Sequence, residues 1–314
     1  LFHIFQPNGF PNVDIIFKNE TASKTHTLKH RFAWALLMWM ISEGKVSTNL
    51  EPEKLNQITG HGGKIIKTDA SLRIVRAQEE AEKNNGFFTN QDGNAMHAED
   101  IHESGNYTHE STNVFHEILQ QLREDETQQK KIPDYFVHSA GTGGTISSVG
   151  RYAKRYNIPT KILLADSEYS IFHDYVLYNK FTNETGTEIW KEPGIAGIGA
   201  GYDVKPLIHG NTTSLTGSVV DESMKMPDLA SVAAMHILRE RGIGGGASTA
   251  LNFLVSLHKA YQLKDGNHIS DRLTIATILG DPAEYYETTY FNPDWINRLF
   301  AERGGMKGLN CWKD

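Results

Sequence analysis

A glycine-rich loop between a predicted strand and a predicted helix constrains the fold of this chain most strongly. Residues 133–150 read Pro-Asp-Tyr-Phe-Val-His-Ser-Ala-Gly-Thr-Gly-Gly-Thr-Ile-Ser-Ser-Val-Gly. Residues 135–138 are rich in aromatic and β-branched side chains, which predicts a buried strand. Apolar Ile146, Val149 and Tyr152 then recur at helical spacing. A strand followed directly by a helix indicates an α/β fold.

The loop itself consists of Gly141, Thr142, Gly143, Gly144 and Thr145. Its three glycines let the backbone curl so that several N–H groups point at one spot, and the helix that follows adds its positive end. Such an arrangement binds anions, and a phosphate group is the expected guest. A tight turn that binds nothing explains the loop equally well, because a glycine loop alone is a weak signal. No Lys-Ser/Thr pair follows, and the spacing misses the dinucleotide fingerprint.

The rest of the chain predicts alternating strands and helices, which favours parallel sheets with covering helices. The predicted strands are 1–6, 13–18, 64–67, 135–138, 161–165 and 273–279, of which the first two form a hairpin. The predicted helices are 27–43, 70–84, 110–124, 146 onward, 227–241 and 248–262. Residues 90–109 are expected to form a loop, and residues 180–220 are expected to be irregular.

A second informative stretch runs from 17 to 31 and contains Lys29 in the predicted first turn of a helix. The helix dipole and burial would both disfavour the charged form of an amine at this position. A neutral amine is the nucleophile that a Schiff base requires. On local sequence alone, a surface lysine in a basic Lys-His-Arg patch is the commoner explanation.

Composition excludes several classes of protein. The chain has 314 residues, enough for one large or two medium domains, and its 39% hydrophobic content is that of a globular protein. A net charge of −7 gives no basic footprint, so no nucleic-acid partner is expected. The longest apolar run, 32–41, is too short to span a membrane. A single cysteine, Cys311, indicates a reducing compartment, and we expect the cytoplasm. Because the sequence opens on Leu1 and not on methionine, we expect that residues are missing before it.

Three histidines offer an alternative site. His97, His102 and His109 lie in a polar stretch with Glu99, Asp100 and Glu103. Their spacing matches no familiar zinc signature, and solvated loop histidines are the commoner explanation, so no metal is expected.

Together, the lysine stretch and the glycine loop resemble the fold type II pyridoxal-phosphate enzymes, in the cysteine synthase and cystathionine β-synthase family. The nearest branch is that of the L-cysteine desulfhydrase-like cysteine synthases. In this family a Lys-x-Glu strand end leads through a polar loop into Thr-Gly-Ser-x-Lys-x-Arg. The matching residues here are 18–20 and 25–31, so Lys29 takes the place of the lysine that holds the cofactor. The family's Gly-Thr-Gly-Gly-Thr phosphate cup is unchanged at 141–145, and the resemblance covers nearly the whole chain.

The resemblance implies an α/β fold with two three-layer α/β/α domains. Residues 27–100 would form a reduced small domain, and residues 1–26 with 101–314 a large cofactor-binding domain. It further implies pyridoxal 5'-phosphate as the cofactor, Gln91 at the substrate carboxylate and Asp281 beside the pyridine nitrogen. The implied chemistry is β-replacement or β-elimination on a small amino acid, with O-acetylserine and sulfide or cysteine as substrates, in a homodimer.

The chain also departs from the family pattern. A Ser/Thr-Ser-Gly-Asn/Ser-Thr loop, which holds the substrate carboxylate in the family, does not occur between Glu43 and Lys64. His26 replaces a glycine near Lys29, and Pro282 and Ala283 replace small polar residues. These changes keep two alternatives open. One is a catalytically impaired relative that acts in binding or regulation, and the other is a truncated product that folds poorly.

Overall fold

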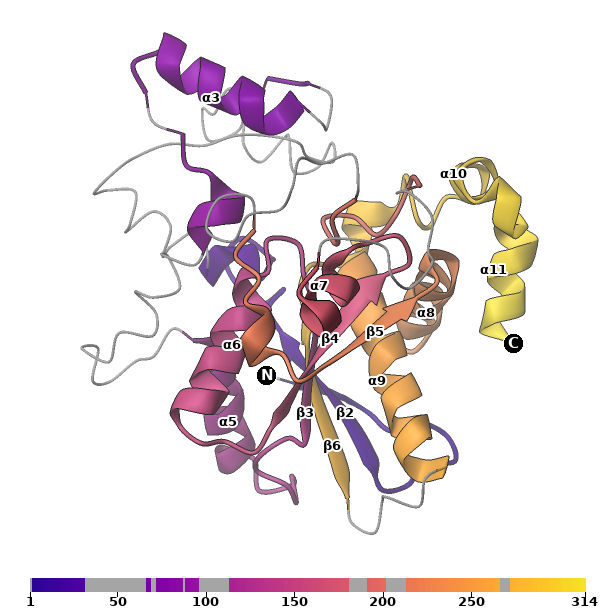
Figure 1. The fold of residues 1–314 in the computed structure, drawn as a ribbon. Coiled ribbons are helices and arrows are strands. Elements are labelled where there is room, and N and C mark those ends of the chain that lie inside the picture. The colour runs from indigo at the N-terminus through magenta and orange to yellow at the C-terminus, as the bar shows by residue number, and fades with distance from the viewer. Residues whose placement is uncertain are drawn as a thin grey trace.

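The computed structural model describes residues 2–31, 66–68, 72–86, 88–95, 113–180, 191–201, 213–265 and 272–314. Its strands form a six-stranded sheet in the order β1-β2-β6-β3-β4-β5 (Figure 1). The strands are β1 (Phe2–Phe5), β2 (Val13–Asn19), β3 (Tyr135–Ser139), β4 (Lys161–Ser167), β5 (Glu222–Met226) and β6 (Leu273–Leu279). Strand β1 is antiparallel to β2, and the other neighbouring pairs are parallel. The late strand β6 therefore lies between the early strands β2 and β3.

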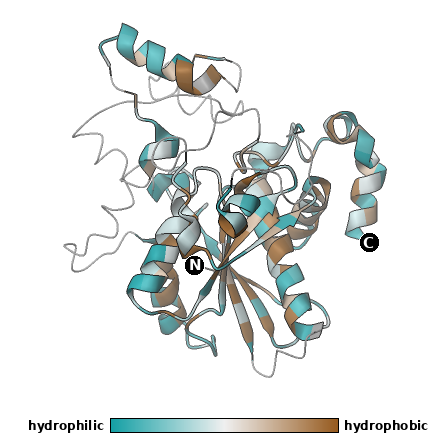
Figure 2. Cartoon of the chain, viewed as in Figure 1, coloured by the Kyte–Doolittle hydropathy of each residue, from teal (hydrophilic) through white to brown (hydrophobic). Residues whose placement is uncertain are grey.

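The central strands bury both of their faces, as parallel strands covered by helices do. In β2, Ile15 and Phe17 belong to one apolar core, whereas Ile16 between them belongs to the other. In β3, Val137 faces the first core and Phe136 the second. Figure 2 shows the resulting hydrophobic colour of these strands. Burial on both sides explains why their sequences are continuous apolar runs.

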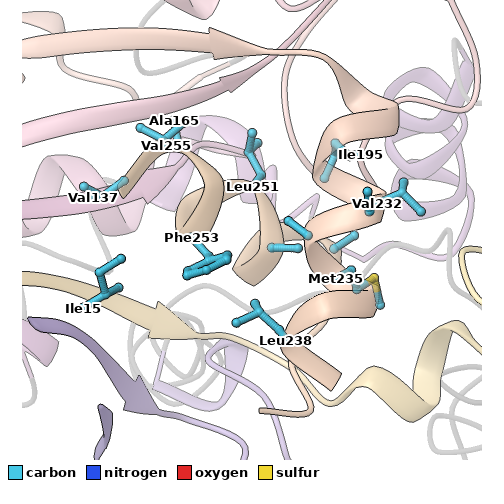
Figure 3. Packing of buried hydrophobic residues seen from close by; sticks show 14 of the residues in the cluster. Ile15, Val137, Ala165, Ile195, Val232, Met235, Leu238, Leu251, Phe253 and Val255 are labelled. Atoms are coloured by element: carbon cyan, nitrogen blue, oxygen red, sulfur yellow. The ribbon is translucent and has the colours of Figure 1, made fainter. Parts of the chain in front are cut away.

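Helices cover both faces of the sheet (Figure 1). Helices α5 (Val114–Glu124) and α6 (Gly144–Arg155) cover one face, and α8 (Asp228–Glu240) and α9 (Ala247–Asp265) cover the other. Figure 3 shows the first core, in which side chains of α8 and α9 pack together with side chains of the sheet. The residues labelled there are Ile15, Val137, Ala165, Ile195, Val232, Met235, Leu238, Leu251, Phe253 and Val255.

The remaining described elements are short. They are α3 (Arg73–Lys83), α7 (Phe172–Tyr178), α10 (Pro293–Leu299), α11 (Gly305–Lys313) and the 3-10 turns η2 (Gly217–Val219), η3 (Ala283–Tyr286) and η4 (Ala301–Arg303). Side chains cap two helices: Asn113 Oδ1 accepts from the amide of Phe115 at 2.9 Å, and Asn292 Oδ1 accepts from the amide of Asp294 at 2.9 Å. No helix in the described ranges is long and apolar enough to cross a membrane.

Most predicted elements are confirmed, and several predictions are wrong. The hairpin, the strands near 135, 161 and 273, and the helices near 73, 114, 144, 228 and 247 all form. Ile66 and Lys67 are not in a strand, and residues 91–95 form a helical turn where a loop was expected. Strand β5 and helices α7, α10 and α11 were missed. Most of the expected small domain, 27–100, and the end of the helix 27–43 lie outside the described residues.

Candidate functional site

The candidate site lies at the edge of the sheet where the parallel strands end. Strands β2, β6 and β3 are neighbours and end at Asn19, Leu279 and Ser139. In open α/β sheets, ligands bind at this carboxyl edge. The chain that leaves β2 is fastened to the end of β6, because Glu20 N donates to Leu279 O at 3.1 Å and Leu28 N donates to Gly280 O at 2.7 Å. The segment before Lys29 therefore lies beside the segment before Asp281.

The glycine loop joins the end of β3 to the start of α6. Gly143 has a left-handed backbone with φ 85°, and a Cβ atom there would collide with Leu215. A Cβ atom on Gly141 would collide with the carbonyl of Gly197. The amide of Gly144 donates to Thr142 Oγ1 at 3.2 Å. Among the residues that the structure describes, the amides of Thr142, Gly143 and Thr145 have no acceptor, so they can receive an anion at the helix N-terminus.

Three further segments hold this loop in place. Ser214 N donates to Thr142 O at 2.8 Å, and the hydroxyl of Ser214 donates to Asp92 O at 2.7 Å. Gly199 N donates to Ala140 O at 2.8 Å. The structure therefore brings together the predicted loop, the segment of Gln91 and the glycine-rich segment 194–199. The side chain of Gln91 itself is exposed.

Lys29 lies at this same edge, but its side chain is exposed. The expectation of a buried amine is therefore wrong. The physical reason is its place: residues 21–28 form turns that are fastened to the end of β6, and the helix starts only at Lys29, where the side chain is exposed. The amide of Lys29 is 3.4 Å from Thr27 Oγ1, which gives the start of this helix a long side-chain cap.

A network of charged side chains fixes the helix turn that bears Lys29. The amine of Lys18 lies 3.0 Å from a carboxylate oxygen of Glu20 and 3.1 Å from one of Glu117 on α5. The guanidinium of Arg31 reaches Glu20 at 2.7 Å and also contacts Glu117. The side chains of Lys18 and Glu20 are only 5% and 3% exposed. Burial alone would raise the pKa of Glu117, but the charges of Arg31 and Lys18 outweigh it and lower that pKa below its ordinary value.

Asp281 follows the end of β6 and is 9% exposed. The hydroxyl of Tyr286 donates to its Oδ2 at 2.7 Å. The amide of Gly246 donates to the carbonyl of Asp281 at 2.9 Å, and a Cβ atom on Gly246 would collide with Asp281 Oδ1. This carboxylate is therefore held in a defined place at the same edge as the loop.

The predicted site residues thus gather at one edge, with two exceptions in burial, Lys29 and Gln91. The three histidines of the alternative metal site lie outside the described residues. Within those described, no group of three or more His, Cys, Asp or Glu could hold a metal ion. Sequence reasoning missed Glu117, Ser214, Tyr286 and Tyr290, since only the fold brings them to the site. The one signal was Tyr285-Tyr286 directly after the last strand segment.

A hollow of about 500 Å³ lies elsewhere, at the amino ends of β3 and β4. It is lined by Lys130, Ile132 and Lys161, among others. The lysines are paired, Lys130 with Asp134 at 2.5 Å and Lys161 with Glu222 at 3.5 Å. We therefore place the candidate site at the opposite, carboxyl edge.

We compared the sequence with known protein families and with individual proteins, and the matches agree with one another. The family described as "Pyridoxal-phosphate dependent enzyme" matches residues 45–277. A protein of Caenorhabditis elegans, named "Putative pyridoxal-phosphate dependent protein", is 55% identical over 344 residues, which cover 98% of this chain and 79% of that protein. An L-cysteine desulfhydrase of Mycobacterium tuberculosis is 26% identical over 330 residues, 94% of this chain and 83% of the relative.

A solved structure shows the fold. The O-acetylserine dependent cystathionine β-synthase from Helicobacter pylori superimposes with a TM-score of 0.66 at 19% identity, covering 92% of this chain and 94% of that one. The α/β fold predicted here, that of the fold type II enzymes, is confirmed.

Proposed function

The chain belongs to the family of pyridoxal-phosphate dependent enzymes and its cofactor is pyridoxal 5'-phosphate; from this premise we propose a reaction and the residues that perform it. The proposed reaction is β-replacement or β-elimination on a small amino acid. It would convert O-acetylserine and sulfide to cysteine and acetate, or cysteine and water to pyruvate, ammonia and sulfide. The names of two relatives, a desulfhydrase and an O-acetylserine dependent synthase, support this class.

The observation that carries the proposal is the geometry of the glycine loop. Left-handed Gly143 stands at the N-terminus of α6 together with the amides of Thr142, Gly143 and Thr145, which have no acceptor among the described residues. A phosphate carries about two negative charges, which these amides and the helix dipole would stabilise together. We assign the phosphate of the cofactor to Gly141, Thr142, Gly143, Gly144 and Thr145.

The other roles follow from position along the same edge. Lys29, which is exposed, can be reached by cofactor and substrate, and it would hold the cofactor covalently. Once the amine of the substrate has displaced Lys29, the freed amine of Lys29 would take the proton from the α-carbon of the substrate. Asp281 would face the ring nitrogen and Gln91 the substrate carboxylate. When bound, the cofactor supplies an electron-withdrawing ring that stabilises the carbon losing its proton.

The test of Lys29 is spectroscopic. The wild-type protein loaded with pyridoxal 5'-phosphate is expected to show the visible absorption band of a lysine-linked cofactor. Lys29→Ala is expected to lose that band, whereas Lys24→Ala, an exposed lysine of the same segment, is expected to keep it. Borohydride reduction and peptide mass spectrometry should place the cofactor on the Lys29 peptide. A band that survives in Lys29→Ala, or a mass on another lysine, would show that Lys29 has no such role.

Activity needs a separate test because the sequence lacks the family's Ser/Thr-Ser-Gly-Asn/Ser-Thr loop. The loaded protein is mixed with O-acetylserine and sulfide and cysteine is measured, and cysteine alone is tested for pyruvate release. Turnover supports the enzyme. A yellow protein without either product favours the second candidate, a catalytically impaired relative that acts in binding or regulation.

The proposal includes an assembly and a domain division. We propose a cytoplasmic homodimer in which residues 27–100 form a small domain and residues 1–26 and 101–314 a large one. The resemblance of the sequence to the family supports both. Light scattering of the loaded protein measures the assembly.

A further inference from the structure

Tyr290 is a buried tyrosine to which the proposed function gives no role. It is 3% exposed, and its ring lies edge-on to that of Trp295 on α10, with the ring centroids 4.9 Å apart. Its hydroxyl donates to the carbonyl oxygen of Gly194 at 2.9 Å and accepts from the amide of Ala196 at 3.0 Å. One side chain therefore binds two main-chain groups of a segment that lies 96 and 94 residues earlier in the chain.

The segment that Tyr290 binds, residues 194–199, lies against the glycine loop. The amide of Gly199 donates to the carbonyl oxygen of Ala140 at 2.8 Å, directly before the loop begins. The carbonyl group of Gly197 is so close to Gly141 that a Cβ atom on Gly141 would collide with it. The position of residues 194–199 therefore limits where the loop 141–145 can lie.

The backbone of this segment needs to be fixed from outside. Gly194, Gly197 and Gly199 have left-handed φ angles of 63°, 73° and 83°. Glycine adopts such angles without a steric cost, but it also adopts many others, so ordering three glycines costs conformational entropy. The two hydrogen bonds of Tyr290 select one conformation. Because Gly194 is buried, loss of the hydroxyl would also deprive a buried carbonyl of a donor.

We propose that Tyr290 is a positioning residue for the phosphate of the cofactor. Its hydroxyl fixes residues 194–199, and these residues hold Gly141 and the loop that follows it in the shape that receives the phosphate. The inference rests on the proposed function, in which residues 141–145 bind that phosphate. Since Tyr290 acts through this loop, its hydroxyl should matter for a ligand that carries the phosphate and not for one that lacks it.

The experiment compares pyridoxal 5'-phosphate with pyridoxal, which has the same ring and aldehyde but no phosphate. The dissociation constants of both compounds are measured for the wild type and for Tyr290→Phe, which removes one oxygen and keeps the ring. Tyr290→Phe is expected to weaken the binding of pyridoxal 5'-phosphate by about tenfold, the effect of one buried hydrogen-bonding group left unsatisfied. The binding of pyridoxal is expected to stay unchanged, whereas general damage to the site would weaken both compounds.

Tyr135→Phe is the matched control. Tyr135 is 6% exposed, and its hydroxyl donates to Glu222 at 3.3 Å at the amino end of β3, away from the glycine loop. This variant loses one hydroxyl from a similarly buried ring and should bind both compounds as the wild type does.

A second variant tests the same segment if Tyr290→Phe does not fold. The φ of 73° at Gly197 disfavours alanine, and a Cβ atom there would meet no atom of the described residues within 4 Å. Gly197→Ala therefore changes the backbone preference of residues 194–199 without a collision. It should weaken the binding of pyridoxal 5'-phosphate and leave that of pyridoxal unchanged.

A measurement on the cofactor-free protein tests the contact itself. Hydrogen exchange of the amides in residues 194–199, followed by mass spectrometry, is expected to be about tenfold faster in Tyr290→Phe than in the wild type. The same amides should exchange at the wild-type rate in Tyr135→Phe. This readout requires neither bound cofactor nor activity.

The inference would be overturned by equal weakening of both compounds, or by no weakening of either, in a folded Tyr290→Phe protein or in the Gly197→Ala protein that replaces it. Unchanged hydrogen exchange in Tyr290→Phe would overturn it as well. Failure of the proposed function shows in the wild type alone: equal affinity for the two compounds would remove the assignment of the phosphate to residues 141–145. The visible band of Lys29 tests the proposed function separately.

Discussion

His26, three residues before Lys29, has a left-handed backbone with φ 55°. The related family carries glycine at this position, and the structure gives the reason: the turn from β2 into the lysine helix needs a positive φ. The ring Nδ1 of His26 lies 3.0 Å from the carbonyl oxygen of Thr21, which offsets part of the backbone cost. The side chain is exposed, so the substitution does not alter the core.

We expect the backbone to decide which side chains residue 26 tolerates. The left-handed conformation costs an ordinary residue about 1–2 kcal/mol and suits a β-branched side chain least. His26→Val should therefore be less stable than His26→Gly by about 1–2 kcal/mol, measured as the free energy of unfolding in urea. Both variants lose the contact with Thr21, so their difference isolates the backbone. Equal stabilities would mean that this turn does not hold φ positive in solution.

Among the elements, α5 is fastened to the end of β2 through Glu117, which contacts both Lys18 and Arg31. Lys18 is almost fully buried, so removing the negative charge of one of its two ion-pair partners is costly. Glu117→Gln is expected to lower the free energy of unfolding by about 1–3 kcal/mol. Glu124→Gln, on the exposed end of the same helix, should change it by less than about 0.5 kcal/mol. Thermal unfolding of the two variants checks the difference, and matching losses would contradict a structural role for the network.

The strands differ in how well the sequence predicts them. Strands β2, β3, β4 and β6 are buried on both faces, so their sequences are apolar runs that stand out. Strand β5 is at the sheet edge, half-buried along its length, and reads Glu-Ser-Met-Lys-Met, which has no strand signal. The glycine loop was predictable because its backbone demands are local.

The partners of the site were not predictable in the same way. The hydroxyl of Ser214 donates to the carbonyl oxygen of Asp92, and that of Tyr290 donates to the carbonyl oxygen of Gly194. The partners of each bond are far apart in the chain, and nothing in their local sequences predicts the contact. The exposure of Lys29 likewise depends on where the turns of residues 21–28 place the start of its helix, which the local sequence does not show.

For the whole molecule, two buried groups make stability depend on pH in opposite directions. Burial lowers the pKa of His138 to about 4, so the unfolded chain binds a proton at this residue more readily than the fold does. The contribution of His138 to the free energy of unfolding therefore rises as pH rises from about 4 to 6.5. Burial raises the pKa of Asp166 to about 6 in spite of hydrogen bonds from the amides of Ser167 and His173. The stabilisation from protonated Asp166 is complete below pH 4 and is lost as pH rises through 6.

Asp166→Asn removes only the second of these effects. Asparagine cannot accept from both amides, so the variant should be less stable than the wild type at pH 4. The difference in free energy of unfolding between the variant and the wild type should shrink by about 2–3 kcal/mol between pH 4 and pH 7. The reason is that only the wild type must bury a charged carboxylate at pH 7. Urea unfolding at several pH values measures this, with Glu126→Gln, an exposed carboxyl, as the control whose difference stays flat. A pH-independent disadvantage would mean that Asp166 ionises normally in the fold.

The insertion of β6 between β2 and β3 has a consequence for synthesis on the ribosome. A nascent chain that has released β2 and β3 has nothing to join them, because their shared neighbour ends only at Leu279. Until that residue emerges, both strands expose open hydrogen-bonding edges, the surfaces that chaperones shield and that aggregation exploits. The emergence of β6, and not the early appearance of the hairpin, therefore sets the moment at which this sheet can close.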